Sequence, residues 1–231
     1  MKLLFLFVII AIFTVNGCTP LQQASETAAD GEYVLIIDPG HGGEDGGAVA
    51  ADGTKESELN LAVALKTDAI CALLGYKTIM TRRSEELDYP KSASTIRAKK
   101  IADQKARVEL VNSTPNAVLM SLHQNIYSSP KPKGAQALYG KFSGSDLFAE
   151  LIQANEAEYI DNENMRNAAK ISDDIYLMKK VQCPAVLIEC GFMSNPDELI
   201  KLKSSDYQMK LAAVFAASYI QFISGTENYY G

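Results

Sequence analysis

Four short apolar runs constrain the fold of this chain more than any other feature. They cover residues 33–37, 77–81, 117–122 and 184–189, and each is rich in branched and aliphatic side chains. Continuous apolar runs of about four to eight residues are typical of strands buried on both faces, which occur mainly in parallel sheets. The runs therefore predict the central strands of a sheet covered by helices on both sides.

Helical patterns stand between and after these runs. Apolar residues recur every three or four positions from Leu59 until Gly75 closes the pattern, and further helices are expected over 96–111, over 146–159, and from Pro196 and Tyr207. Residues 134–139 predict one more strand. This alternation predicts an α/β fold, a three-layer domain with a mostly parallel central sheet flanked by helices.

Length and composition fit one globular domain. The 231 residues are 47% hydrophobic and 22% charged, which is enough apolar material for a proper core and unlike a disordered chain. The formal net charge is -6, and the lysines and arginines are scattered among acids. Nucleic-acid binding is excluded on this ground, because it needs a basic patch.

The N-terminal segment has the layout of an export signal. Met1 and Lys2 precede an apolar run over residues 3–15, which is shorter than the roughly 20 residues that a membrane span needs. Residues 15–18 resemble a bacterial lipobox, in which Cys18 would be lipidated; an uncleaved N-terminal anchor is the alternative. We expect a signal segment (1–18), a flexible linker (19–31) and a catalytic domain (32–231) tethered to the membrane outside the cytoplasm.

The remaining cysteines, Cys71, Cys183 and Cys190, are odd in number and lack the close spacing of metal-binding pairs. A disulfide framework is therefore not expected. Cys71 lies in a helical pattern and Cys190 follows a strand, so both are predicted to be small buried residues.

The chain contains two histidines, and both stand where a predicted strand ends. His41 follows the first strand after a Pro-Gly turn, and His123 comes directly after Leu122. Glu189 closes the last strand. Because ligand sites of open α/β sheets lie beyond the carboxyl ends of the strands, we expect these side chains to share one site. A shared metal ion explains both histidines at once.

A catalytic zinc site usually combines three protein ligands, drawn from histidine and carboxylate, with one open position. The third ligand is expected among the acids near His41, and Glu56 stands just before the helix expected from about Glu58. Spacing does not choose between the acids of this segment, which are Glu44, Asp45, Asp52, Glu56 and Glu58. Glu189 also has two interpretations, a catalytic carboxylate or a structural acid at a strand end.

Four ordered motifs resemble the zinc-dependent N-acetylmuramoyl-L-alanine amidases of the amidase type 3 family. They are the Asp-Pro-Gly-His-Gly-Gly segment around His41, Glu56 before Leu-Asn-Leu, the Ser-Leu-His-Gln-Asn segment around His123, and residues 186–195 around Glu189. The resemblance implies that His41, Glu56 and His123 bind zinc and that Glu189 is catalytic. It also implies the substrate, the peptidoglycan amide between N-acetylmuramic acid and L-alanine.

Within that family, residues 107–112, 133–136 and 175–178 are most similar to the germination-specific amidases that act on the spore cortex. Glu58 stands where aspartate is common, and Gln124 where a small residue is common. The resemblance leaves any protein partner unidentified.

Two other functions share part of this pattern. A zinc carboxypeptidase also uses two histidines and a glutamate, but it tends to place a histidine and an acid on one short segment, whereas His41 and Glu56 are well separated here. A wall-binding lipoprotein without catalysis would be marked by loss of a ligand or of Glu189, and none is lost.

Overall fold

The computed structural model describes the backbone of residues 32–230 and the side chains of residues 32–225. The expected signal segment (1–18), its Cys18 and the linker (19–31) lie outside the described residues. Among the described helices, none is both long and apolar enough to cross a membrane.

The centre of the fold is a six-stranded sheet with the order β2-β1-β3-β6-β4-β5. Every neighbouring pair is parallel except β4 and β6, which are antiparallel. The predicted α/β fold with a mostly parallel sheet is therefore confirmed. The strands are β1 (Val34–Pro39), β2 (Thr78–Met80), β3 (Ala117–Asn125), β4 (Gln136–Tyr139), β5 (Ala169–Lys170) and β6 (Ala185–Phe192).

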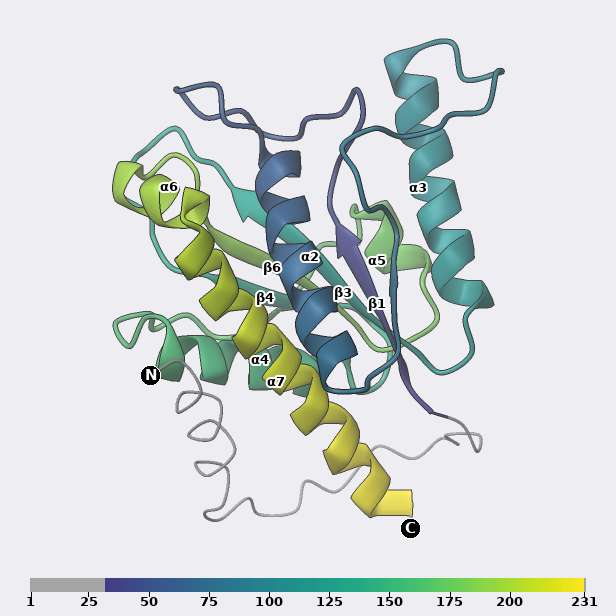
Figure 1. The fold of residues 1–231 in the computed structure, drawn as a ribbon, viewed down its shortest axis with the longest axis vertical. Helices are drawn as coiled ribbons and strands as arrows, with labels where there is room; N and C mark the ends of the chain where they lie inside the picture. Colours follow the sequence, from purple (N-terminus) through teal and green to yellow (C-terminus); the bar gives the residue numbers. More distant parts are fainter. Residues whose placement is uncertain (1–31, 231) are drawn as a thin grey trace.

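Helices cover both faces of this sheet (Figure 1). On one face α2 packs against α7 and the central strands, α4 packs against α7 and β4, and α6 lies beside α7; on the other face α3 packs against α5. The helices are α2 (Glu56–Leu73), α3 (Ile96–Ser113), α4 (Ser145–Tyr159), α5 (Tyr176–Lys180), α6 (Pro196–Lys203) and α7 (Ser205–Tyr230).

Two separate hydrophobic clusters explain why the strand sequences are apolar at every position. Leu35, Ile37 and Met120 belong to the cluster under α2, α4 and α7, whereas Ile36 and Leu119 belong to the cluster under α3 and α5. Successive strand residues point to opposite faces. Both faces are covered, so both sets of side chains are apolar and fully buried or nearly so.

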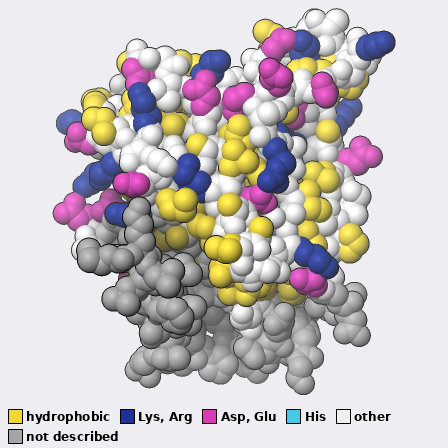
Figure 2. Space-filling view, in the orientation of Figure 1, with side chains coloured by type: hydrophobic (Ala, Val, Ile, Leu, Met, Phe, Trp, Pro, Cys, Tyr) yellow, Lys and Arg dark blue, Asp and Glu magenta, His cyan; other side chains and the backbone are white. Residues whose placement is uncertain are grey.

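The surface agrees with the charge pattern of the sequence. Figure 2 shows the face covered by α2 and α7, where basic and acidic side chains are interspersed without a basic patch. The three described cysteines, Cys71, Cys183 and Cys190, are free and buried, and burial was predicted for Cys71 and Cys190.

The structure differs from the sequence predictions in a few elements. β5 and α5 were not predicted, because two and five residues are too short to show a period. The helix predicted near Glu58 begins at Glu56 itself.

Strand register brings the site together. Pro39 of β1 is level with Leu122 of β3, and His123 of β3 is level with Glu189 of β6. The segment between β1 and α2 then arches over the carboxyl ends of these strands (Figure 1). The end of β1, the start of α2 and the ends of β3 and β6 thus meet at one edge of the sheet.

Candidate metal centre

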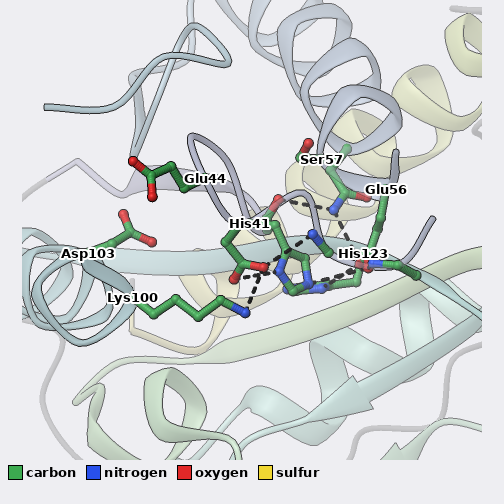
Figure 3. A network of polar contacts seen from close by, with 12 residues as sticks. His41, Glu44, Glu56, Ser57, Lys100, Asp103 and His123 are labelled. Atoms are coloured by element: carbon green, nitrogen blue, oxygen red, sulfur yellow. Dashed lines mark hydrogen bonds and ion pairs between the residues drawn. The ribbon is translucent and has the colours of Figure 1, made fainter. Parts of the chain in front are cut away.

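His41, Glu56 and His123 form the one group of potential metal ligands found among the described residues, with ligand atoms within 4.8 Å of one another. Glu56 lies between the two imidazoles: its Oε2 is 3.3 Å from His41 Nε2, and its Oε1 is 3.0 Å from His123 Nδ1. The two rings are 5.1 Å apart and nearly perpendicular. Figure 3 shows the three side chains converging from β3, α2 and the loop after β1.

Glycines make this convergence sterically feasible. A Cβ atom on Gly40 would collide with the ring of His123, and one on Gly47 would lie 2.6 Å from Glu56 Oε2. Gly47 also has a φ of 69°, a left-handed conformation that glycine adopts without strain. The glycine-rich motif around His41 therefore lets the loop backbone pass directly over the ligand side chains.

The Glu56 carboxylate is buried but surrounded by hydrogen-bond donors. Its Oε2 accepts from the Ala48 backbone N–H at 2.9 Å, and its Oε1 accepts from the Gln124 backbone N–H at 3.1 Å and from Asn60 Nδ2 at 3.4 Å. Burial alone would raise the pKa of Glu56, but the hydrogen bonds and charges of the two histidines hold it well below its usual range. The group is therefore an anion, as a metal ligand must be.

Asp45 orients His41. One of its oxygens lies 3.0 Å from His41 Nδ1, and the other pairs with Lys100 of α3 at 2.8 Å. Burial on its own lowers the pKa of His41, but the contacts with Glu56 and Asp45 raise it overall. A carboxylate that holds one imidazole nitrogen leaves the other directed at the metal position, a common arrangement around bound zinc.

The other acids of this segment do not contact both histidines. Glu44 pairs with Lys99, Asp52 pairs with Lys203 at 2.6 Å, and the side chain of Glu58 is exposed. Asp45 touches His41 but is held by Lys100. The geometry therefore brings Glu56 to both histidines, which spacing alone did not decide.

These three residues fit zinc. Tetrahedral zinc with ligands at 2.0–2.2 Å places its ligand atoms roughly 3.4 Å apart. The observed 3.0 and 3.3 Å separations between the carboxylate oxygens and the imidazole nitrogens are close to that spacing. Two imidazoles and one carboxylate are also a donor set found in catalytic zinc sites.

Glu189 stands beside this group. It is level with His123 across β3 and β6, and its Oε2 is buried without a hydrogen-bond partner among the described residues. Burial and the nearby charge of Glu56 raise the pKa of Glu189, although the two histidines oppose the shift. This unpartnered oxygen belongs to a residue level with His123, at the sheet edge where the three candidate ligands meet, and that position favours a chemical role over a structural one.

Sequence reasoning gave no role to Asn60 and noted Gln124 only as a departure that could alter the support of the site; both contact the candidate ligand Glu56. Asn60 follows Glu56 by one helical turn, and its Nδ2 donates to the Gly40 carbonyl at 3.1 Å and to Glu56 Oε1 at 3.4 Å. Gln124 Nε2 donates to Asn60 Oδ1 at 3.2 Å. The i, i+4 spacing on an expected helix was the available signal for Asn60. Gln124 gave no signal except its departure from the family pattern.

Residues 35–220 match the protein family described as N-acetylmuramoyl-L-alanine amidase. A germination-specific N-acetylmuramoyl-L-alanine amidase of Bacillus subtilis is 36% identical over 181 residues, which are 78% of this chain and 75% of that protein. The N-acetylmuramoyl-L-alanine amidase AmiC of Escherichia coli is 24% identical over 82% of this chain, which spans 52% of AmiC.

Among solved structures, the CwlD amidase of Clostridioides difficile, determined in complex with the GerS lipoprotein, superimposes with a TM-score of 0.80. The two chains are 34% identical, and the superposition covers 84% of this chain and 99% of that one.

Proposed function

The chain belongs to the N-acetylmuramoyl-L-alanine amidase family and is a cell-wall hydrolase, and from this premise we propose how its residues perform the reaction. His41, Glu56 and His123 bind one zinc ion, and Glu189 carries the proton. The bond that is cut joins the lactyl group of N-acetylmuramic acid to the L-alanine of the stem peptide.

One observation carries the proposal. The two histidines of the chain meet on opposite oxygens of a single buried carboxylate, at 3.3 and 3.0 Å. Two neutral imidazoles and one carboxylate would leave a divalent ion with a net positive charge. The three ligands come from separate parts of the chain and converge only at the carboxyl end of the sheet.

A zinc ion held by His41, Glu56 and His123 would acidify a water molecule and polarise the amide carbonyl of the substrate. Glu189 accepts a proton from the attacking water as a general base and then donates it to the amide nitrogen as a general acid. The water oxygen forms a bond to the carbonyl carbon, and the carbon–nitrogen bond breaks. The products are the lactyl carboxylate of the sugar and the free amino group of L-alanine.

Glu189→Gln tests the proton-transfer role. The variant keeps the shape of the side chain but cannot accept the proton, so the release of L-alanine amino ends from purified peptidoglycan should fall roughly 10²- to 10⁴-fold. Zinc content should stay at the wild-type level, because Glu189 is not a ligand. Glu109→Gln, an exposed site on α3, is the matched control and should keep normal activity.

Two results would contradict these assignments. Near-normal turnover by Glu189→Gln would remove Glu189 from the reaction. New amino ends at a residue other than L-alanine would favour the zinc carboxypeptidase.

We further propose that the enzyme is exported and held at the membrane through a lipid on Cys18. The support is the signal-like pattern of residues 1–18. Labelled fatty acid should be incorporated by the wild type and not by Cys18→Ala. An unlabelled wild-type protein that still sediments with membranes would instead indicate an uncleaved anchor.

A role on the spore cortex is a narrower proposal. It is supported by the 36% identity to the germination-specific amidase. The purified enzyme should release L-alanine ends faster from cortex peptidoglycan than from vegetative wall of matched cross-linking. Equal rates on the two substrates would contradict the proposal.

We also propose a protein partner at the membrane surface, because the structurally similar CwlD was solved with a lipoprotein bound. Cross-linking in intact cells should trap the enzyme with a second, extracytoplasmic protein. Recovery of the enzyme uncross-linked in every condition would argue against this partner.

A further inference from the structure

Two arginine side chains are buried beside the loop that carries His41. Arg82 follows β2 and is 5% exposed, and Arg107 lies on α3 and is 3% exposed. Arginine is almost never this deeply buried unless its charge is paired. Arg82 pairs with Glu85 at 2.8 Å, and Arg107 pairs with Asp38 at 2.6 Å and with Asp103 at 2.9 Å.

These two arginines are paired with three acids, so they add no excess positive charge beside the candidate metal site. The two guanidinium groups also donate hydrogen bonds to backbone carbonyls. One of these acceptors is the Ser84 carbonyl, 3.0 Å from Arg82 Nη1. All the others are backbone carbonyls of the two segments that bear His41 and Glu56.

Arg107 holds the backbone of His41. Its Nη2 donates to the His41 carbonyl at 2.7 Å, and its Nη1 donates to the Pro39 carbonyl at 2.9 Å. His41 has a φ of 62°, a left-handed conformation that is strained for a residue with a side chain. Hydrogen bonds on both sides of Gly40 fix the path of the chain through this strained position.

Arg82 joins the two ligand segments to each other. Its Nε donates to the Pro39 carbonyl at 3.0 Å, and its Nη2 donates both to the Gly40 carbonyl at 3.1 Å and to the Ser57 carbonyl at 2.8 Å. Gly40 immediately precedes His41, and Ser57 immediately follows Glu56. One planar guanidinium therefore spans the His41 loop and the first turn of α2.

Glu85 completes this connection. Its Oε1 accepts from Arg82 Nη1, its Oε2 accepts from the Ser57 hydroxyl at 2.7 Å, and its backbone carbonyl accepts from the Gly43 N–H at 2.6 Å. The Arg82–Glu85 pair thus contacts the chain on both sides of His41 and at the start of α2. A lysine has no planar fork, so it could not replace these contacts.

We propose that Arg82 and Arg107 are positioning residues that form the metal-ligand set before the metal binds. Arg82 fixes His41 relative to Glu56, and Arg107 fixes the left-handed backbone of His41. This inference rests on the proposed zinc site, and it explains part of the affinity of that site for zinc. It assigns neither arginine a contact with substrate.

The test is zinc affinity rather than activity. Arg82→Lys and Arg107→Lys keep the buried charge but lose the fork, and each should weaken zinc binding about 10- to 100-fold, the usual effect of an outer partner of a ligand. The probe is zinc itself, titrated into metal-free full-length protein against a chelator of known affinity. Cobalt-loaded samples should show an altered visible spectrum, which reports ligand geometry directly.

Arg83→Lys is the matched control. Arg83 is the next residue, carries the same charge and also pairs with an acid, Asp68 at 2.6 Å, but its side chain is 61% exposed. Zinc affinity and the cobalt spectrum of this variant should equal those of the wild type. Equal losses in Arg82→Lys and Arg83→Lys would overturn the proposal.

Folding is checked separately on the metal-free proteins by circular dichroism and thermal unfolding. If Arg82→Lys does not fold, Glu85→Gln replaces it, because that side chain is 37% exposed and its change leaves the guanidinium in place. A severalfold loss of zinc affinity is then expected.

The outcomes distinguish the two proposals. A folded Arg82→Lys or Glu85→Gln protein with wild-type zinc affinity and an unchanged cobalt spectrum would overturn the positioning role while leaving the zinc site intact. A wild-type protein that binds neither metal would contradict the proposed function itself.

Discussion

Two buried glutamates occupy opposite kinds of environment in this molecule. Glu56 at the candidate metal centre is buried among backbone N–H groups, an amide and two imidazoles. Glu156 on α4 is equally buried, but its Oε1 has no hydrogen-bond partner among the described residues, and the charges near it are those of Glu198 and Asp161. The pKa of Glu56 is held well below its usual range, whereas burial and these two acids raise the pKa of Glu156 to about 8.

The difference shows that burial does not decide the charge of a carboxyl group; the donors around it do. At the metal centre the donors keep Glu56 ionised and ready to bind a cation. Between α4 and its neighbours Glu198 takes the available donors, accepting the N–H groups of Gly134 and Phe192 at 2.8 Å each. Glu156 is therefore mostly protonated at neutral pH.

Glu56→Gln is expected to have the largest effect, because it places a neutral side chain at the candidate metal centre, as protonated Glu156 is neutral in its own surroundings. We expect zinc affinity to fall by more than about 100-fold, beyond the effect usual for an outer partner of a ligand. Equilibrium dialysis followed by metal analysis measures it. Glu58→Gln, two residues along α2 and exposed, should bind zinc normally. Retention of wild-type affinity by Glu56→Gln would remove Glu56 from the ligand set.

Asp45→Asn tests whether a residue that contacts a proposed ligand, without being one, contributes to zinc affinity. The change removes the carboxylate that lies 3.0 Å from His41 Nδ1, and zinc affinity should fall about 10- to 100-fold. Asp52→Asn lies in the same loop but pairs with Lys203, so it should leave the affinity unchanged. Indistinguishable titrations for the two variants would mean that Asp45 does not orient His41.

Glu156→Gln tests the raised pKa of Glu156 through the pH dependence of protein stability. The carboxyl has a pKa near 4.5 when unfolded and about 8 when folded, so the folded state holds one more proton between these values. Its contribution to stability is fully present below about pH 4.5 and is lost as the pH rises to about 8, at about 1.4 kcal/mol per pH unit.

Urea unfolding at a series of pH values measures this slope. The wild type should lose stability between pH 5 and pH 8 relative to Glu156→Gln, whose amide does not titrate. Glu150→Gln, on the exposed side of the same helix, should follow the wild type. Parallel stability curves for the wild type and Glu156→Gln would show that Glu156 is ionised in the folded protein.

Asn195→Ala is the smallest expected effect and tests how Glu198 is placed beside Glu156. Asn195 caps α6 by accepting from the backbone N–H groups of Asp197 and Glu198 at 3.1 and 3.2 Å. Loss of such a cap typically costs about 1 kcal/mol of unfolding free energy, and zinc affinity should not change. An unchanged urea midpoint would mean that the cap contributes nothing to this region.

The strands of the sheet could be predicted from the sequence because each is marked by a short apolar run of its own. The apolar runs that became β1, β3 and β6 are continuous since both faces are covered, and the site residues follow from where those runs end. β4 was predicted as a strand, but its antiparallel direction depends on the long-range pairing of Ala137 with Ile188. No local pattern encodes that direction.

The metal centre was predicted only partly for the same reason. Two histidines at strand ends suggested a metal, but Glu56 could be separated from Asp45 only by the family resemblance, because both lie in the same segment. Arg82 and Arg107 gave no sequence signal of burial, since arginine is ordinarily exposed. Their role depends on carbonyls that only the fold brings within reach.

X-ray absorption at the zinc edge of the zinc-loaded protein would identify the ligands of the ion. We expect a first shell made only of nitrogen and oxygen at about 2.0–2.2 Å, with the scattering pattern of two imidazoles, and loss of one oxygen ligand in Glu56→Gln. A sulfur neighbour near 2.3 Å, or a shell with fewer than two imidazoles, would contradict the proposed ligand set.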